Sequence, residues 1–183
     1  VGDLSAQTRA IYDFIERVLK EGGGSFDDIV HLKLCVKHNS TEADGTSFLD
    51  RILDVTKEYV GENGPVVTCF CVDLLYPGLD LEIDAMAFKS NHQRMTLGPA
   101  GSKVHDGYFP DSIRASDEIW VGGQVAQSDA GEVMAPGDIR EQARIVFQRL
   151  RDVLALSDAS LDDIVKMNLF FTASGEDVKE ELH

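Results

Sequence analysis

Residues Asp3–Val36 read DLSAQTRAIYDFIERVLKEGGGSFDDIVHLKLCV, and residues Asp138–Phe171 read DIREQARIVFQRLRDVLALSDASLDDIVKMNLFF. The two stretches align without a gap at an offset of 135 positions, and eleven of the 34 aligned positions are identical. An internal repeat sets the number of domains before any other feature of a sequence. A period of this length indicates two tandem units rather than a solenoid, whose repeats run to about 20–50 residues.

Each copy of the repeat predicts the same local structure. Apolar residues at helical spacing predict an amphipathic helix over 4–19 and again over 139–154. A Ser-hydrophobic-Asp-Asp turn follows each helix. The alternating runs after it predict strands over 29–36 and 164–171.

The rest of the chain alternates further helical and strand patterns. We predict a helix over 48–60, the start of another over 175–183, and strands over 66–74, 81–88, 112–115 and 119–125, with a short strand near Val133. Segment 91–104 has no sustained period and contains Gly-Pro and Ala-Gly, which favours a linker. The predicted domains are therefore residues 1–90, which lack an N-terminal hairpin, the linker 91–104, and residues 105–183, which lack a C-terminal strand pair.

Neither predicted unit holds every element of the pattern. One full unit would have the order β-β-α-β-α-β-β, and each copy has only part of it. Because open sheet edges promote aggregation, we expect the chain to be an interior slice of a longer tandem protein. The alternative is a complete chain whose missing strands come from partners.

The charge of the chain bears on its partners. It has 17 Lys and Arg against 32 Asp and Glu, a net charge of −15. Such a surface repels phosphate backbones, and no cluster of basic residues offsets it, so we expect no nucleic-acid partner. No apolar run approaches the roughly 20 residues that a membrane helix needs, so we expect no membrane partner either.

The three cysteines bear on the cellular compartment. Cys35, Cys69 and Cys71 are an odd number, and no secretory leader is visible. This combination favours reduced thiols in the cytoplasm. The five histidines show no ligand spacing that would make a metal site with these cysteines, so we expect buried thiols and no metal.

Several motifs, in order, resemble those of one known family. The stretches IWVGGQV at 119–125, DAGEV at 129–133 and DIREQAR at 138–144 are similar to the opening half of the Rid/YjgF family of reactive intermediate deaminases. The stretches GPVVTC at 64–69 and LEIDAMA at 81–87 are similar to its closing half, and ASLDDIVK at 159–166 to its middle. The likeness spans nearly the whole chain.

The resemblance implies a fold, an assembly and an activity. The fold would be α+β of chorismate-mutase type, a mixed sheet with two helices packed on one face, here in two tandem units. The assembly would be a homo-oligomer, a trimer of units with ligand clefts between neighbours. The activity would be hydrolysis of a small enamine or imine such as 2-aminoacrylate to ammonia and a 2-keto acid, without a cofactor.

The resemblance also implies the site residues. Glu82 matches the family glutamate and would act as acid/base or position a water. We expect the substrate-binding residues to be Val67, Thr68, Cys69, Phe109, Gly122 and Gly123. The arginine that binds the substrate carboxylate in the family falls at Val67, which cannot form that ion pair.

Other functions compete with deaminase activity. Val67 favours a non-catalytic small-molecule binder or a structural paralogue. Ribonuclease activity is sometimes attached to the family, and the charge of −15 argues against it here. At the level of single residues, Glu82 could be a polar residue at a sheet edge. The pair Gly122–Gly123 indicates close approach of the backbone to a ligand or a neighbouring subunit rather than a phosphate loop.

Overall fold

A computed structural model gives the fold of the chain, and it describes residues 3–37, 47–61, 64–74, 76–89, 94–98, 109–128 and 130–172. The structure confirms the α+β class, with three α-helices and two three-stranded sheets among these residues. The elements are α1 (Leu4–Glu21), η1 (Phe26–Asp28), β1 (Ile29–Lys37), α2 (Phe48–Val60), β2 (Val66–Val72), β3 (Leu81–Ala87), β4 (Met95–Leu97), β5 (Ser112–Ala115), β6 (Glu118–Val121), α3 (Ile139–Ala155) and η3 (Leu161–Asp163). The chain divides into two compact units, 1–123 and 124–183.

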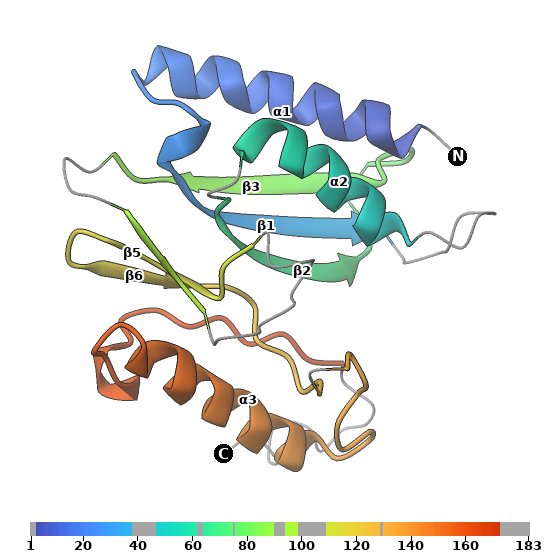
Figure 1. The fold of residues 1–183 in the computed structure, drawn as a ribbon. Coiled ribbons are helices and arrows are strands. Elements are labelled where there is room, and N and C mark those ends of the chain that lie inside the picture. The colour runs from blue at the N-terminus through green and yellow to red at the C-terminus, as the bar shows by residue number, and fades with distance from the viewer. Residues whose placement is uncertain are drawn as a thin grey trace. The chain divides into compact units, whose positions relative to one another are not determined.

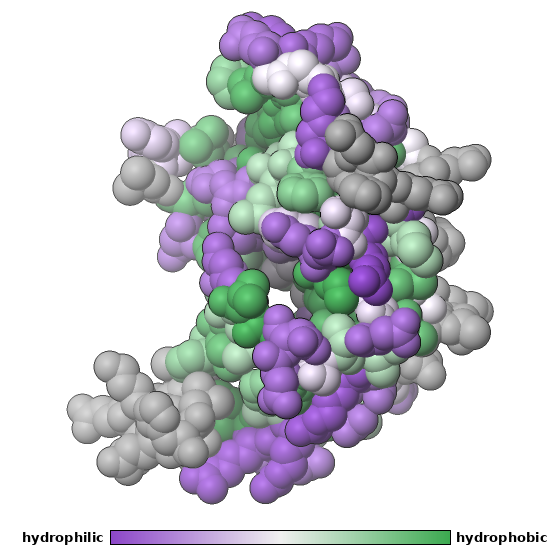
Figure 2. All heavy atoms as spheres, turned by 90° about the vertical axis from the view of Figure 1, so that its left-hand side faces the viewer, coloured by the Kyte–Doolittle hydropathy of each residue, from purple (hydrophilic) through white to green (hydrophobic). Residues whose placement is uncertain are grey.

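Strand β1 is the centre of the first unit. It pairs in parallel with β2 on one side and antiparallel with β3 on the other. Helices α1 and α2 both lie on one face of this sheet (Figure 1). The side chains of Leu32, Leu34 and Val36 are buried in the core between sheet and helices. Figure 2 shows hydrophilic residues along the top of the molecule, where α1 lies, and apolar residues gathered beneath them.

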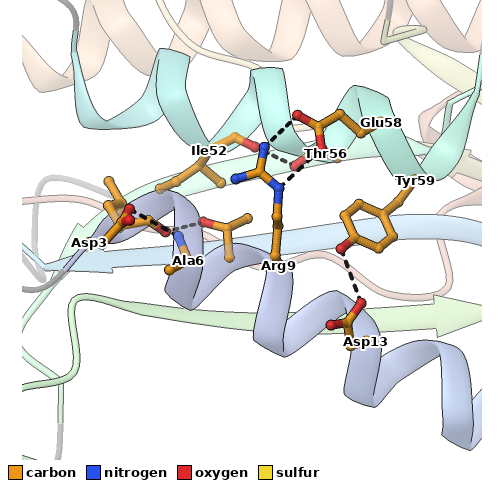
Figure 3. Close-up of polar contacts among 10 residues, drawn as sticks. Asp3, Ala6, Arg9, Asp13, Ile52, Thr56, Glu58 and Tyr59 are labelled. Atoms are coloured by element: carbon orange, nitrogen blue, oxygen red, sulfur yellow. Dashed lines mark hydrogen bonds and ion pairs between the residues drawn. The ribbon is translucent and has the colours of Figure 1, made fainter.

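Three polar contacts between side chains connect the two helices, one of them buried and two exposed. The hydroxyl groups of Tyr12 and Thr56 are 2.8 Å apart in the core, and burial raises the pKa of Tyr12, so its hydroxyl stays protonated. On the surface Arg9 pairs with Glu58, with 2.7 Å between Nη2 and Oε1, and Tyr59 donates to Asp13 (Figure 3). The exposed ion pair contributes little, because solvent screens the two charges. The helices are therefore held mainly by the burial beneath them.

The second sheet is built around a hairpin. Strand β5 pairs antiparallel with β6 and with β4, and a two-residue turn at Ser116–Asp117 joins β5 to β6, with Ser116 at φ 57°. Positive φ in a two-residue turn fits the twist of the flanking strands. Strand β4 falls within 91–104, so the predicted linker contributes to a sheet. Three residues are too few for a strand period to be visible in the sequence.

This hairpin packs on the helix-free face of the first sheet. Ile113 and Ala115 of β5 form a cluster with Val30 of β1 and Val66 of β2, and Trp120 of β6 packs against it. The sequence places this hairpin in the predicted domain 105–183, whereas the folded chain places it in the compact unit 1–123. The opening hairpin of the second copy thus completes the core of the first. The boundaries 1–90, 91–104 and 105–183 stay a prediction about the tandem sequence units.

The second copy repeats the local structure of the first but not its strand. Ser160 and Asp163 form the same capping box at η3 that Ser25 and Asp28 form at η1. Residues 164–172 form no strand, so the strand predicted over 164–171 is wrong. Strand β1 needs β2 and β3 beside it, and the described part of the second copy contains no counterpart of either. The predicted helix at 175–183 lies outside the described residues.

The repeat supplies a matched test of the core. Leu34 is fully buried, and its repeat partner Leu169 is 53% exposed. We expect Leu34→Ala to lower the free energy of unfolding by about 2–5 kcal/mol, because it leaves a cavity in a packed core. Leu169→Ala should change it by less than about 0.5 kcal/mol. Urea unfolding followed by the fluorescence of Trp120 measures both, and equal effects would contradict the assignment of β1 as the core strand.

Candidate functional site

Two motif segments far apart in the sequence meet at the edge of β2. The amide of Gly123 donates a hydrogen bond to the carbonyl of Val67 (2.9 Å), and the amide of Gly122 donates to the carbonyl of Asp111 (2.9 Å). A Cβ atom on Gly122 would lie 3.2 Å from the Val67 oxygen, and one on Gly123 would lie 3.2 Å from Cγ2 of Thr68. Glycine is therefore needed for the approach of the two backbones. The sequence predicts a close approach of the Gly122–Gly123 backbone to a ligand or a neighbouring subunit, and in the structure this backbone lies against β2 of the same compact unit.

A bulge in β1 turns a histidine towards this place. The register of β1 with β3 shifts between Ile29 and His31. Ile29 lies in the helix-side core, whereas Val30 lies in the cluster on the opposite face. Strand alternation from Leu32 backwards puts His31 on that opposite face as well. Bulges commonly redirect side chains next to functional sites.

His31 and Thr68 form a polar pair on the helix-free face. Nε2 of His31 lies 2.9 Å from Oγ1 of Thr68, within hydrogen-bond distance. Both side chains are half-buried, and Gly123 beside them is exposed. A hydroxyl group hydrogen-bonded to an imidazole can exchange protons or bind an anion. This pair and the two glycines make the candidate site.

Three of the expected substrate-binding residues lie on the helix side of the sheet instead. Val67 and Cys69 pack against the helix-side core, and Phe109 is buried within it. An arginine in place of Val67 would have to lose its hydration there, which is costly without an acidic partner. The apolar side chain of valine fits this position, which faces the helix-side core.

The thiols next to the site are protonated. Burial raises the pKa of Cys69 to about 12, with smaller contributions from Cys71 and Cys35. Burial also raises the pKa of Cys35. Because the thiolate is the reactive form, neither group is an activated nucleophile at neutral pH. Cys35 is buried as expected, whereas Cys71 is exposed, and all three cysteines are free.

Glu82 lies on the same face as Thr68 but at a distance from it. It is exposed on β3 opposite Cys35, and β1 separates it from β2. Two strand spacings make about 10 Å. Next to Glu82, Asp84 forms an ion pair with Lys33 and raises the pKa of Lys33 through that hydrogen bond. The structure therefore brings together Thr68, Gly122, Gly123 and the backbone carbonyl of Val67, and leaves Glu82 two strands away.

Sequence reasoning missed two polar residues near the site, His31 and Arg94. Arg94 donates to the carbonyl oxygens of Asp27 and Gly64, both at 2.8 Å, at the start of β1 and β2. Burial lowers the pKa of Arg94. No motif marks Arg94, which falls in the predicted linker. For His31 the one available signal is the basic residue Lys166 at the matching position of the repeat.

The residues that the structure describes contain no group of three or more His, Cys, Asp and Glu side chains placed to hold a metal ion. They also contain no helix that is both long and apolar enough to cross a membrane.

Comparison with known proteins identifies relatives of both sequence copies. The sequence model of the family described as Endoribonuclease L-PSP matches residues 1–89 and 102–181. Protein MMF1, mitochondrial, of Saccharomyces cerevisiae is 33% identical over 78 residues, which are 41% of this chain and 53% of that protein. The 2-iminobutanoate/2-iminopropanoate deaminase of Dermatophagoides farinae is 27% identical over 64 residues, 35% of this chain and 50% of that protein. The chain spans about half the length of the curated relatives it matches.

A solved structure is also similar. It is a candidate endoribonuclease from Thermotoga maritima MSB8, with a TM-score of 0.42 and 24% sequence identity, and the match covers 50% of this chain and 66% of that one.

The glycine contacts at β2 can be tested by substitution. We expect Gly122→Ala to lower the free energy of unfolding by roughly 1–3 kcal/mol, because the added methyl group would press on the backbone of Val67. Gly22 is a suitable control, since it has an ordinary φ of −77° and its added Cβ would meet nothing nearer than 3.4 Å. Urea unfolding of both variants measures the difference. An equal, small effect for the two would show that the segment after β6 does not lie against β2.

Proposed function

The chain belongs to the Endoribonuclease L-PSP family, which is the Rid/YjgF family, and we propose that it hydrolyses a small amino-acid-derived imine or enamine. In this reaction the oxygen of a water molecule adds to the imine carbon and the C–N bond then breaks. Both protons of the water end on the nitrogen, which leaves as ammonia, and the carbon becomes a ketone. An enamine first takes a proton on carbon and loses one from nitrogen to become the imine.

The observation that carries the proposal is the meeting of two family motifs at β2. Residues 64–69 belong to the first sequence copy and residues 119–125 to the second, and the hydrogen bond from Gly123 to Val67 joins them in the fold. The hydroxyl of Thr68 is the nearest polar side chain there. The name of the Dermatophagoides farinae relative gives support of the same kind, since it describes an imine deaminase.

Glu82 is our candidate for the group that moves the proton. It is an exposed carboxylate on the helix-free face, and among the described residues no ion pair or hydrogen bond occupies its side chain. Because it lies two strands from Thr68, we propose that a neighbouring unit of a homo-oligomer, a trimer of units, completes the cleft. A carboxylate within hydrogen-bond reach of the attacking water can take its proton and return it to nitrogen.

We place the protein in the cytoplasm as part of the same proposal. Its three free cysteines favour a reducing compartment. The name of the Saccharomyces cerevisiae relative places that protein in mitochondria.

A non-catalytic binder or structural paralogue is the second candidate function, and Val67 is the observation that favours it. Without a basic residue at this position, the usual ion pair with a substrate carboxylate cannot form there. Such a protein would bind small carboxylates and release no ammonia. The two functions therefore differ in one measurable product.

An ammonia-release assay on 2-aminoacrylate made in situ tests the proposal. We expect release above the uncatalysed rate, and we expect Glu82→Gln to lower kcat by about 10²–10⁴-fold, because an amide cannot accept the proton. Glu21→Gln is the matched control, since Glu21 is an exposed carboxylate at the end of α1. Wild-type protein that releases no ammonia above background would leave the binder as the function.

A further inference from the structure

On the helix-free face of the first sheet, a side chain that can take a positive charge lies next to the Thr68 hydroxyl. His31 lies beside Thr68, with 2.9 Å between Nε2 and Oγ1. In a chain with a net charge of −15, a local cation is needed to hold any anion. A histidine provides one as soon as it is protonated.

The charge state of His31 decides what Thr68 offers to a ligand. A protonated imidazole can only donate hydrogen bonds. Its Nε2–H would then be directed to Oγ1 of Thr68, and the hydroxyl hydrogen of Thr68 would be left to donate elsewhere. With Nε2 deprotonated, Thr68 donates to His31 instead and presents an oxygen lone pair. Protonation of His31 therefore fixes Nε2 as the donor, leaves the hydroxyl hydrogen of Thr68 for a ligand and places a positive charge behind it.

The approach to Thr68 runs past Gly123. A Cβ atom on Gly123 would lie 3.3 Å from Oγ1 of Thr68, so the missing side chain leaves this hydroxyl uncovered. Gly123 itself is exposed. A ligand oxygen can therefore come within hydrogen-bond distance of Thr68 from this side.

Among the described residues, the other groups around His31 do not supply a competing cation that is free to bind. Along β1, Lys33 is paired with Asp84 of β3, and Glu82 adds a negative charge on the same strand. Strand β2 contains no charged residue, and the hairpin presents Ile113, Ala115 and Trp120 to the sheet. Two more titratable groups lie near this end of the sheet. These are Arg94, held by two carbonyl oxygens, and Asp111, which precedes β5.

We propose that Thr68 and protonated His31 bind the carboxylate of a small monocarboxylic acid. Thr68 contacts the ligand, and His31 is a positioning residue that acts through it. Only the choice of ligand class in this inference rests on the proposed function. The same position of the second copy holds Lys166, a cation at all physiological pH values.

Calorimetric titration with 2-oxobutanoate at about pH 5.5 and about pH 8 tests this site. We expect wild-type protein to bind roughly tenfold more tightly at the lower pH, where an imidazole is protonated. His31→Gln and Thr68→Val should bind weakly at both pH values. His31→Lys should bind at both pH values with little difference between them, because lysine keeps its charge.

Two controls make the outcome decisive. Lys166→Gln removes the repeat partner of His31 and should leave the pH dependence unchanged. Circular dichroism and thermal melting check that each variant folds, and His31→Lys tests the site even where His31→Gln is unstable. The proposal is overturned if His31→Gln keeps the pH dependence of the wild type, since the carboxylates nearby would then be its source.

The result can be told apart from that of the ammonia assay. Binding that follows the charge at position 31, with no ammonia released, supports this site and rejects the deaminase function. Ammonia release with binding indifferent to the His31 variants rejects this site and leaves the deaminase function standing.

Discussion

The whole first unit depends on the burial of one strand. Strand β1 has β2 on one edge, β3 on the other, and α1 and α2 over the face that carries Leu32 and Leu34. Each fully buried leucine of this kind contributes about 1.5–3 kcal/mol through removal of apolar surface from water. The surface ion pair between Arg9 and Glu58 contributes little in comparison. The strand therefore fixes where both of its faces, and any site on them, must lie.

The same constraint explains why two similar segments fold differently. Residues 27–30 and 162–165 have the same sequence, and both serine-led capping boxes form, because capping depends only on neighbours along the chain. A strand depends on partners that are distant in sequence. Among the described residues such partners exist for β1 and not for 164–172, where Val165 is fully exposed. Local sequence determined the turn, and non-local pairing determined the strand.

The sequence predicts features that depend on neighbouring residues better than features that depend on distant segments of the chain. The helical periods of residues 4–19 and 48–60 and the turn at Ser116–Asp117 are local signals, and each gave the element found. The hairpin of the second copy packs on Val30 and Val66, which no periodicity reveals. The place of His31 depends on a bulge that appears only when β1 pairs with β3. The family motifs indicated which residues to examine, but not which face each side chain takes.

The two faces of the first sheet have different roles: one packs the core, and the other carries the candidate site. Valine at position 67 and the protonated thiol of Cys69 belong to the helix side, where apolar groups pack and a charge would be costly. His31 and Thr68 lie on the opposite side, where the hairpin covers part of the sheet and Gly123 leaves a hydroxyl within reach of solvent. A cation is less costly on this second face, because His31 and Thr68 are only half-buried there and lie within hydrogen-bond distance of each other. Loss of the family arginine from β2 is therefore compatible with anion binding by the unit, provided that the charge comes from the neighbouring strand.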